Sequence, residues 1–477
     1  MMSDFGALLD SLLQDTIGRS LGVFAPELVL CATILVTLFV RLFDADRRLP
    51  TYWVALVGAF GAFLLSYFQF VQLRQGGDAE AYFTGLLVFD QFSVFFRVFL
   101  SLFLVLVVSL TILTGLPDLE DGPDFYTLLV GSTIGMMLMA SANHLLILFL
   151  GVEMASVPSY AMVGFLKGRR SSSEAALKYV VYGAGAAGVM LYGVSLLAGL
   201  LGTANLPQIA AQLESLAHSG RGIVDPVVRT AFLGALMILA GLAFKLSLVP
   251  FHFWCPDAFE GAPAEVAGYL SVASKAAAFA LLVRFCLAFA GSDAESLQAL
   301  FRALGVGLGL VAVVTATYGN LVAFVQNNMK RLLAYSTIAH AGYMLMAVAA
   351  VLIISNAPAG APFDAAVESR RCLEGLLYYL CVYLFMNLGA FAIVALIRNE
   401  IFSEDIRDYN GLGWQAPLLG VCMAICLFSL TGVPPLGGFV GKLFIFASVI
   451  QAAKIAPWMW VVLVLGLLNT VFSLFYY

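Results

Sequence analysis

Charged residues are scarce in this chain: of its 477 residues, only 11% are Asp, Glu, Lys or Arg. Soluble domains contain about 25% charged residues, so this scarcity excludes an ordinary soluble protein. The formal net charge of -5 argues against a basic surface, and we therefore expect no nucleic-acid partner. With 62% hydrophobic residues and a mean hydropathy of +0.97, the composition instead indicates a membrane protein.

Cysteine motifs and a cleaved export signal are also missing. The seven cysteines form no CxxC pair and no Cys/His cluster, and most lie in apolar runs, so we interpret them as small apolar fillers. We expect no metal and no cofactor in this chain. The first residues carry Asp4, Asp10 and Asp15 and lack a basic start before an apolar core, so the first span should remain in place.

One short motif resembles a nucleotide site but lacks the surroundings of one. The stretch GAGAAG (Gly183–Gly188) fits the pattern GxGxxG. A dinucleotide site requires this pattern between a strand and a helix, with an acidic residue about 20 residues later. Here the glycines lie inside a long apolar run, so we interpret them as small residues at a helix–helix contact.

Apolar runs near 20 residues long recur from one end of the chain to the other, and each can cross a bilayer as a helix. This pattern predicts an all-α polytopic membrane protein without a soluble domain. The thirteen predicted spans are roughly 24–42, 52–73, 89–114, 125–142, 144–166, 175–201, 228–250, 264–290, 303–325, 332–354, 375–397, 415–450 and 456–477.

The positive charges between these spans predict their orientation, because cytoplasmic loops are rich in Lys and Arg. Loops after odd-numbered spans hold Arg47, Arg48, Lys167, Arg169, Arg170, Lys330, Arg331, Arg398 and Arg407. Loops after even-numbered spans hold fewer, namely Arg74, Arg221, Arg302, Arg370 and Lys454. We therefore expect the odd-numbered loops in the cytoplasm and the N-terminus outside.

Several charged residues lie inside predicted spans, where a charge costs about 2.5–3.5 kcal/mol on insertion scales. They are Glu153, Lys178, Lys245, Lys275 and Lys442. A structural ion pair or a lysine that reaches the membrane interface could explain each one. Lys178 follows a predicted capping box at 171–174, near a span end, and both interpretations remain open for it. The other three lysines are central, which favours a functional role.

The central lysines outnumber the carboxylate that could neutralise them. Glu153 cannot pair with Lys245, Lys275 and Lys442 together, so some of them must be neutral part of the time or be hydrated. Because burial disfavours the charged form of a lysine, such a residue can gain and lose a proton near neutral pH. A row of these lysines, bridged by water and by His340, would form a proton relay.

Two predicted spans contain helix-breaking residues. The seventh has Pro250 in KLSLVPFHFW, and the twelfth has Pro434 and Pro435 in LTGVPPLGGF. Both stretches contain the pattern L-x-x-V-P, five spans apart, and an odd offset reverses the helix direction. Spans 4–8 and 9–13 could therefore be inverted repeats with paired broken helices, which is typical of transporters.

Long motifs give the chain a family resemblance. The stretches MMLMASANHLLILFLGVEMASVPSYAMVGF, SSSEAALKYVVYGA, FKLSLVPFHFWCPDAFEGAP, NNMKRLLAYSTIAHAGYMLMA and LTGVPPLGGFVGKLFIF resemble the antiporter-like subunits of respiratory complex I, the bacterial NADH:quinone oxidoreductase. The resemblance covers about residues 85–477. It implies N-terminal helices 1–3 at 1–124, a first inverted repeat of helices 4–8 at 125–290, and a second repeat of helices 9–13 at 303–477.

The resemblance also assigns residues. It implies that Glu153 is the fifth-helix glutamate, Lys178 its sixth-helix neighbour, Lys245 the lysine beside the seventh-helix break, Lys275 the eighth-helix connecting lysine and Lys442 the twelfth-helix residue. A lysine at this last position, without a long lateral C-terminal helix, narrows the resemblance to one branch of these subunits. That branch implies fourteen spans, so we expect that C-terminal residues are missing from this sequence.

By resemblance, the chain is a proton-translocating subunit in a bacterial plasma membrane, driven by quinone reduction elsewhere in the complex. It would do no redox chemistry itself, and NADH, FMN, iron–sulfur clusters and quinone would bind to partner subunits. The partners implied are other antiporter-like and small helical membrane subunits. Three alternatives remain: a subunit of a sodium/proton antiporter, a subunit of a membrane-bound hydrogenase, and a structural spacer with inactive channels.

Overall fold

The structure is a computed structural model that describes residues 10–43, 49–76, 79–118, 121–219 and 225–477. Of the charges used above to predict orientation, Arg47, Arg48 and Arg221 lie outside the described residues, as does Asp4 of the N-terminal stretch. Within the described part, 12 helices are long and apolar enough to cross a membrane, and two shorter apolar helices accompany them. The predicted all-α polytopic fold is therefore confirmed.

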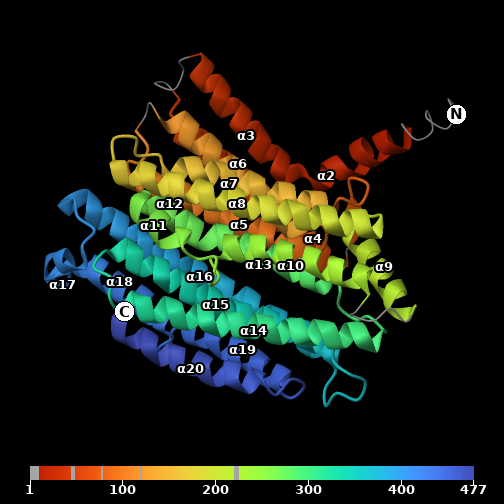
Figure 1. The fold of residues 1–477 in the computed structure, drawn as a ribbon. Coiled ribbons are helices and arrows are strands. Elements are labelled where there is room, and N and C mark those ends of the chain that lie inside the picture. The colour runs from red at the N-terminus through yellow and green to blue at the C-terminus, as the bar shows by residue number, and fades with distance from the viewer. Residues whose placement is uncertain (1–9, 44–48, 77–78, 119–120, 220–224) are drawn as a thin grey trace. The chain divides into compact units, whose positions relative to one another are not determined.

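The chain divides into two compact units, and unit 1 comprises residues 1–162 and 202–209. Its elements in chain order are the π-helical turn η1 (Thr16–Ser20), α2 (Leu21–Val23), α3 (Ala25–Leu42), α4 (Thr51–Arg74), β1 (Glu80–Tyr82), β2 (Leu87–Phe89), α5 (Gln91–Thr114), α6 (Gly122–Ser141) and α7 (Leu145–Val163) (Figure 1). Helix α4 packs against α3 and α5, and α6 packs against α3 and α5. The short antiparallel hairpin β1–β2 was not predicted from the sequence.

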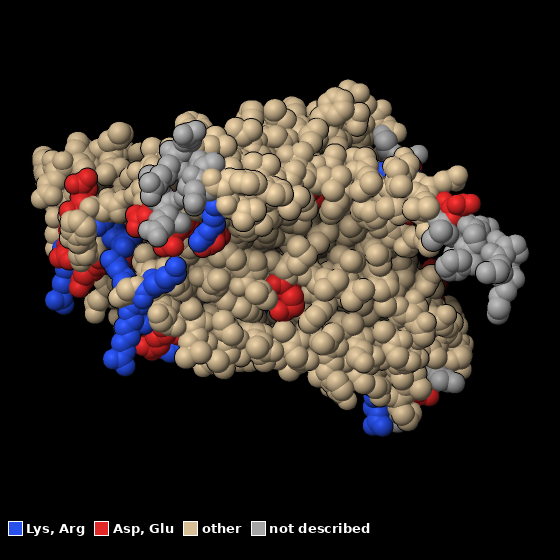
Figure 2. Space-filling model, turned by 90° about the horizontal axis from the view of Figure 1, so that it is seen from above, with Lys and Arg blue, Asp and Glu red and all other residues tan. Residues whose placement is uncertain are grey.

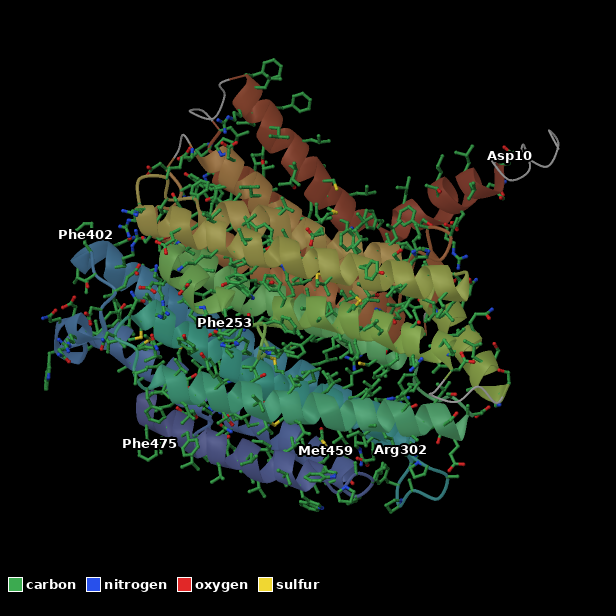
Figure 3. All side chains as sticks on the ribbon, viewed as in Figure 1. Asp10, Phe253, Arg302, Phe402, Met459 and Phe475 are labelled. Atoms are coloured by element: carbon green, nitrogen blue, oxygen red, sulfur yellow. The ribbon has the colours of Figure 1, made fainter. Side chains whose placement is uncertain are left out.

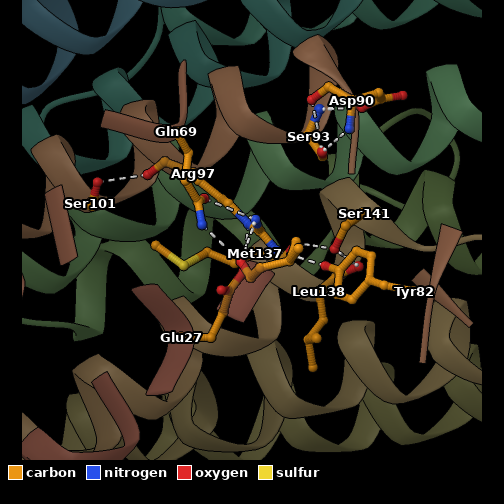
Figure 4. A network of polar contacts seen from close by, with 11 residues as sticks. Glu27, Gln69, Tyr82, Asp90, Ser93, Arg97, Ser101, Met137, Leu138 and Ser141 are labelled. Atoms are coloured by element: carbon orange, nitrogen blue, oxygen red, sulfur yellow. Dashed lines mark hydrogen bonds and ion pairs between the residues drawn. The ribbon is translucent and has the colours of Figure 1, made fainter. Parts of the chain in front are cut away.

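An arginine inside the third span connects several elements of unit 1 through its side chain (Figure 4). Arg97 of α5 is fully buried, and its Nε lies 2.7 Å from Oε1 of the equally buried Glu27 on α3. Its other nitrogens donate to Gln69 of α4 at 3.2 Å and to the hydroxyl of Tyr82 in β1 at 2.6 Å. Because a buried charge must be paired, these contacts fix three helices and the hairpin around one guanidinium group.

Unit 2 comprises residues 163–201 and 210–477, so α9 begins in unit 1 and ends in unit 2. Its elements are α8 (Arg170–Leu201), α9 (Leu206–His218), α10 (Pro226–Leu246), α11 (Trp254–Gly261), α12 (Ala264–Tyr269), the π-helical turn η2 (Leu270–Ser274), α13 (Lys275–Leu287), α14 (Glu295–Ala323), α15 (Met329–Ser355), α16 (Ala365–Ile401), the 3-10 turn η3 (Ile406–Tyr409), α17 (Leu412–Gln415), α18 (Pro417–Thr431), α19 (Gly437–Ala453) and α20 (Met459–Tyr476).

Helix α15 forms the core of unit 2. Its most apolar 18-residue stretch is entirely buried, as expected for a helix that is apolar on all sides. Helices α14, α16 and α19 pack against it, and α20 packs against α14 and α19 (Figure 1). Helix α10 packs against α8, where Gly193 and Gly234 allow the two backbones to approach closely.

Both predicted broken helices are confirmed, and the two breaks share one type of turn. Helix α10 is followed by Ser247 and α18 by Gly432, and both residues take the left-handed conformation, with φ of 58° and 89°. The next amide donates back five residues, from Leu248 to Ala243 and from Val433 to Phe428, which is the Schellman pattern. The turn begins three residues before Pro250 but two before Pro434, so the shared L-x-x-V-P letters are one residue out of register.

Several boundaries differ from the prediction because amphipathic turns extend the apolar cores. Helices α8, α14 and α16 start about 5–10 residues earlier than the hydropathy pattern indicates, since their charged first turns still form helix. The capping box predicted at 171–174 is wrong, because α8 already begins at Arg170. The GAGAAG stretch is helical as expected, but among its residues only Gly183 is buried. A Cβ added to Gly185 or Gly188 would meet no other atom within 4 Å, so these two glycines do not form the predicted helix–helix contact within the described residues.

The outer surface suits contact with lipid. Most of the face seen in Figure 2 is uncharged, and its blue and red atoms gather mainly near the left and right edges. Large apolar side chains project outward on many elements, among them Phe253, Phe402 and Phe475 (Figure 3), of which Phe402 is 86% exposed. An apolar exterior over helices of this length is the arrangement expected in a bilayer.

Candidate functional site

Lys442 bridges the second helix break by bonding from α19 to the end of α18. It lies on α19, is 3% exposed, and its Nζ donates to the carbonyl oxygens of Leu430 at 2.9 Å and Thr431 at 2.8 Å. These oxygens belong to the last turn of α18, whose carbonyls have no partner within the helix and favour a positive charge. The ammonium group also lies 4.7 Å from the ring centroid of Tyr343. The sequence places a lysine where the ends of two half-helices meet.

Lys275 lies at a second helix irregularity. It follows the π-helical turn η2 directly and is 1% exposed. Its Nζ donates to the main-chain oxygen of Thr337 on α15 at 3.1 Å. Single π-helical turns inside α-helices occur frequently at functional sites, because they shift the side-chain register. Among the described residues, no salt bridge joins Lys275 or Lys442 to a carboxylate.

Lys245 lies in the last turn of α10, two residues before the left-handed Ser247. Its side chain is 1% exposed. The preceding turn is fixed by aromatic packing, in which Trp254 donates to the carbonyl of Phe244 at 2.9 Å and stacks on Tyr179 of α8. The seventh-span lysine is therefore buried beside a break, as the sequence predicts.

His340 lies on α15 between two tyrosine hydroxyls. Its Nδ1 is 2.5 Å from the hydroxyl of Tyr379 on α16, and its Nε2 is 3.1 Å from the hydroxyl of Tyr477. Thr337, which accepts from Lys275, lies three residues before His340 on α15. The ring of Tyr343 lies 5.8 Å from the imidazole and 4.7 Å from Nζ of Lys442, so unit 2 brings the three predicted relay residues near one another. The sequence singled out His340 but not its two tyrosine partners.

Lys178 differs from the other predicted site residues. Its side chain is 42% exposed, and its Nζ pairs with Glu174 at 3.0 Å and with Asp257 of α11 at 2.9 Å. Asp257 also accepts from Arg331 of α15 at 3.0 Å. These contacts favour the structural ion pair that the sequence left open for Lys178, and its part in a relay stays a prediction.

Glu153 belongs to unit 1 and lies in the middle of α7. The helix continues through Pro158 without a break. Next to the glutamate, α6 and α7 approach so closely that a Cβ on Gly135 would lie 2.6 Å from the amide nitrogen of Ala155. The carboxylate is therefore carried by a tightly packed helix pair.

Sequence reasoning missed several buried polar groups in unit 2. His252, two residues after Pro250, is 3% exposed, and neither of its ring nitrogens has a hydrogen-bond partner among the described residues. The same holds for Oε2 of Glu265 on α12, which is 1% exposed, and for Oγ of Ser274. Native interiors leave few such groups without partners, so each marks a polar spot in unit 2 that could bind water, and Ser274 lies directly before Lys275. A histidine beside a helix-breaking proline was the available signal.

Lys330 corrects another prediction. The sequence placed it in a cytoplasmic loop, but it lies in the first turn of α15 and is 2% exposed. Its Nζ lies 2.9 Å from Glu404 and donates to the carbonyl of Ala262, between α11 and α12, at 2.7 Å. The lysine therefore secures the segment that connects the first break to the helix of Lys275.

Gly438→Ala should disturb the second break. A Cβ on Gly438 would lie 1.8 Å from the carbonyl oxygen of Ser429. The first turn of α19 and the last turn of α18 would therefore have to move apart. We expect a loss of about 1–3 kcal/mol in the free energy of unfolding, as for other overpacked positions. Titration with a denaturing detergent measures it. Gly185→Ala is the matched control, because a Cβ on that glycine would meet no other atom within 4 Å. Equal stability of the two variants would contradict the expectation.

The chain is similar in sequence to a family of known membrane proteins. Residues 142–473 match the family described as "NADH:quinone oxidoreductase/Mrp antiporter, TM". The chain is 39% identical over 471 residues to NADH-quinone oxidoreductase subunit N 2 of Chloroherpeton thalassium, covering 98% of this chain and 86% of that relative. It is 41% identical over 474 residues to subunit N of an Anaeromyxobacter species, covering 96% and 86%.

Solved structures agree on the fold. A chain of respiratory complex I from Thermus thermophilus is 30% identical, with a TM-score of 0.71 over 94% of this chain and 87% of that one. A chain of the Mrp complex from a Dietzia species has a TM-score of 0.76 over 95% and 80%, but at 21% identity it supports the fold alone. The resemblance drawn from the sequence motifs is confirmed. The chain therefore belongs to the NADH:quinone oxidoreductase/Mrp antiporter family of membrane proteins, and the relatives that it matches over nearly its whole length are subunits N of NADH-quinone oxidoreductase.

Proposed function

We propose that this chain moves protons across a bacterial plasma membrane as subunit N of a respiratory complex I, with its N-terminus outside. The observation that carries the proposal is the environment of Lys275 and Lys442. Both are buried at helix irregularities and bonded to main-chain carbonyl oxygens, and neither forms a salt bridge with another described residue. Burial without a counter-ion disfavours the charged form of a lysine, which brings its neutral and charged forms closer in free energy near neutral pH, and a proton carrier needs both forms.

The relay in this proposal consists of Glu153, Lys178, Lys245, Lys275, His340 and Lys442. Glu153 and Lys178 hold the charge that biases Lys245. When neighbouring charges shift, Lys245 releases its proton through Lys275 and His340 to Lys442, and from there the proton leaves. The chain does no redox chemistry, and NADH, FMN, iron–sulfur clusters and quinone belong to partner subunits.

The energies involved are of comparable size. Moving one charge against 100 mV requires about 2.3 kcal/mol. A change of two units in the pKa of one lysine supplies about 2.7 kcal/mol. Modest changes in the surroundings of each lysine can therefore drive one charge across the membrane when several such steps act in sequence.

The test replaces the relay residues in the intact complex. In membrane vesicles, Lys245→Ala and Lys442→Ala should each lower NADH-driven proton pumping at least about tenfold, because a positioned proton-transfer group contributes that much or more to a rate. Lys454→Ala is the control, since this exposed lysine lies past the end of α19. Equal amounts of assembled complex must be confirmed for every variant.

The outcomes separate the rival functions. If both relay variants pump and reduce quinone as the wild type does, the chain is a structural spacer and the proposal is wrong. Sodium-dependent proton exchange by the purified chain would favour an antiporter subunit. Co-purification with a hydrogen-evolving partner in place of NADH-oxidising subunits would favour a hydrogenase.

A further inference from the structure

A chain of hydroxyl groups crosses the core of unit 2 through His340. Nε2 of the imidazole is 3.1 Å from the hydroxyl of Tyr477, which also bonds to the hydroxyl of Ser336. Nδ1 on the opposite side is 2.5 Å from the hydroxyl of Tyr379. His340 and Tyr379 are at most 1% exposed. Each nitrogen of the ring is therefore occupied by one hydroxyl.

The two ends of this chain lie beside the lysines of the proposed relay. Ser336 directly precedes Thr337, whose carbonyl oxygen accepts from Lys275 at 3.1 Å. Tyr379 packs against the residue that precedes Lys442, since a Cβ on Gly441 would lie 2.4 Å from Cδ2 of the tyrosine ring. The hydroxyls and the imidazole thus connect the surroundings of the two lysines.

Tyr383 shows that the arrangement is specific. It lies one turn from Tyr379 on α16, is fully buried, and its ring centroid is 5.3 Å from that of His340. Its hydroxyl bonds to neither nitrogen of the ring, because these bond to Tyr379 and Tyr477. The rings of Tyr343 and Tyr379 also lie near the imidazole, at 5.8 Å and 6.0 Å between centroids. Only the hydroxyls of Tyr379 and Tyr477 bond to its nitrogens.

We propose that Tyr379 and Tyr477 are proton-transfer residues that make His340 a two-sided relay between Lys275 and Lys442; this inference rests on the proposed function. A neutral imidazole has one N–H donor and one acceptor nitrogen. Whichever nitrogen carries the hydrogen, one tyrosine donates to the ring and the other accepts from it. The imidazole can then take a proton on one side and release another from the opposite side.

The protons balance at each atom. A proton reaches the oxygen of Tyr477 as that hydroxyl passes its own to Nε2, and Nδ1 passes its hydrogen to Tyr379, which releases one toward Lys442. Each oxygen gains one proton and loses one, and the ring gains and loses one. The ring ends as the other tautomer, so the hydroxyls and the ring must return to their starting arrangement before the next transfer.

The test removes single hydroxyls from the intact complex. Tyr379→Phe and Tyr477→Phe keep the rings and should each slow NADH-driven proton pumping roughly tenfold, as expected for the loss of a positioned proton-transfer group. Tyr383→Phe is the matched control and should pump as the wild type does. His340→Gln, which can still donate and accept hydrogen bonds but cannot pass a proton through a ring, should be as slow as Tyr379→Phe.

The pumping rates of these variants distinguish failure of the tyrosine relay from failure of the proposed function. If both Phe variants pump at the wild-type rate while Lys442→Ala does not, the proton bypasses the tyrosines and this inference is wrong, although the proposed function stands. If Lys442→Ala also pumps normally, the proposed function itself fails. If Tyr379→Phe does not assemble, Tyr477→Phe decides alone. Failure of both to assemble, with Tyr383→Phe intact, would make the hydroxyls structural and would overturn the proposal.

Discussion

Arg97→Met should destabilise unit 1 by about 3–5 kcal/mol, the range measured when one partner of a buried ion pair is removed. The substitution keeps a long apolar side chain but removes every donor of the guanidinium group. Glu27, at 2.7 Å and fully buried, would lose its counter-ion, and the hydroxyl of Tyr82 and the amide of Gln69 would lose their bonds. The cost comes mainly from the carboxylate left in an apolar interior.

Denaturing-detergent titration of the purified protein measures this change in the free energy of unfolding. Arg74→Met is the control, because Arg74 is exposed at the end of α4 and should change stability by less than about 0.5 kcal/mol. The double variant Arg97→Met with Glu27→Leu should recover most of the loss, since neither charge is then buried alone. A single variant as stable as the control would show that Glu27 is already protonated and needs no counter-ion.

Lys330→Met should cost about 3 kcal/mol, at the lower end of the same range. Glu404, half-buried with a side chain 14% exposed, would lose its nearest cation, but Arg398 lies 3.6 Å from it and would compensate in part. The carbonyl of Ala262 would also lose its donor. Because that carbonyl lies where α11 passes into α12, we expect proton pumping to fall with stability.

Arg371→Met is the matched control for this second prediction. Arg371 pairs with Glu368 at 2.6 Å, but its side chain is 67% exposed, and exposed pairs contribute about 0–1 kcal/mol. The same detergent titration compares the two variants. If Lys330→Met and Arg371→Met lose equal stability, the buried pair adds nothing to the packing at the first break.

The sequence predicted features that depend on local composition. Apolar length located the spans, and proline located both breaks, at Pro250 and Pro434, because a proline in a membrane helix removes one hydrogen bond wherever it occurs. The insertion cost of a charge likewise singled out Lys245, Lys275 and Lys442. These predictions required no knowledge of which helices are neighbours.

Features that depend on distant partners were not predicted. Arg97 lies inside the predicted span 89–114 but was not among the charges singled out there. Its partner Glu27 lies 70 residues earlier, and nothing local connects them. Lys330 was taken for a loop charge because hydropathy cannot show that Glu404 folds back against it. The one-residue shift between the two breaks was hidden for the opposite reason: the letters match, but Ser247 takes the left-handed conformation that Gly432 adopts more easily.

The tyrosines around His340 were missed for a related reason. Tyr379 and Tyr477 lie in apolar spans, where a tyrosine is compatible with any packed interior. Only the arrangement of α15, α16 and α20 brings their hydroxyls to the two ring nitrogens. Reasoning from each helix alone can rank residues by the free-energy cost of placing them in the membrane. It cannot identify which residues of different helices contact each other.

The complete burial of the apolar stretch of α15 has a consequence for the order of synthesis. Two of the helices that cover it, α16 and α19, follow it in the chain, and α19 ends at Ala453. While the ribosome is still making those residues, α15 must lie against lipid or the insertion machinery, with Lys330 and His340 not yet enclosed. The core of unit 2 is therefore completed only after α16 and α19 have been synthesised. Until then the exposed surface of α15 makes the nascent protein prone to misassembly.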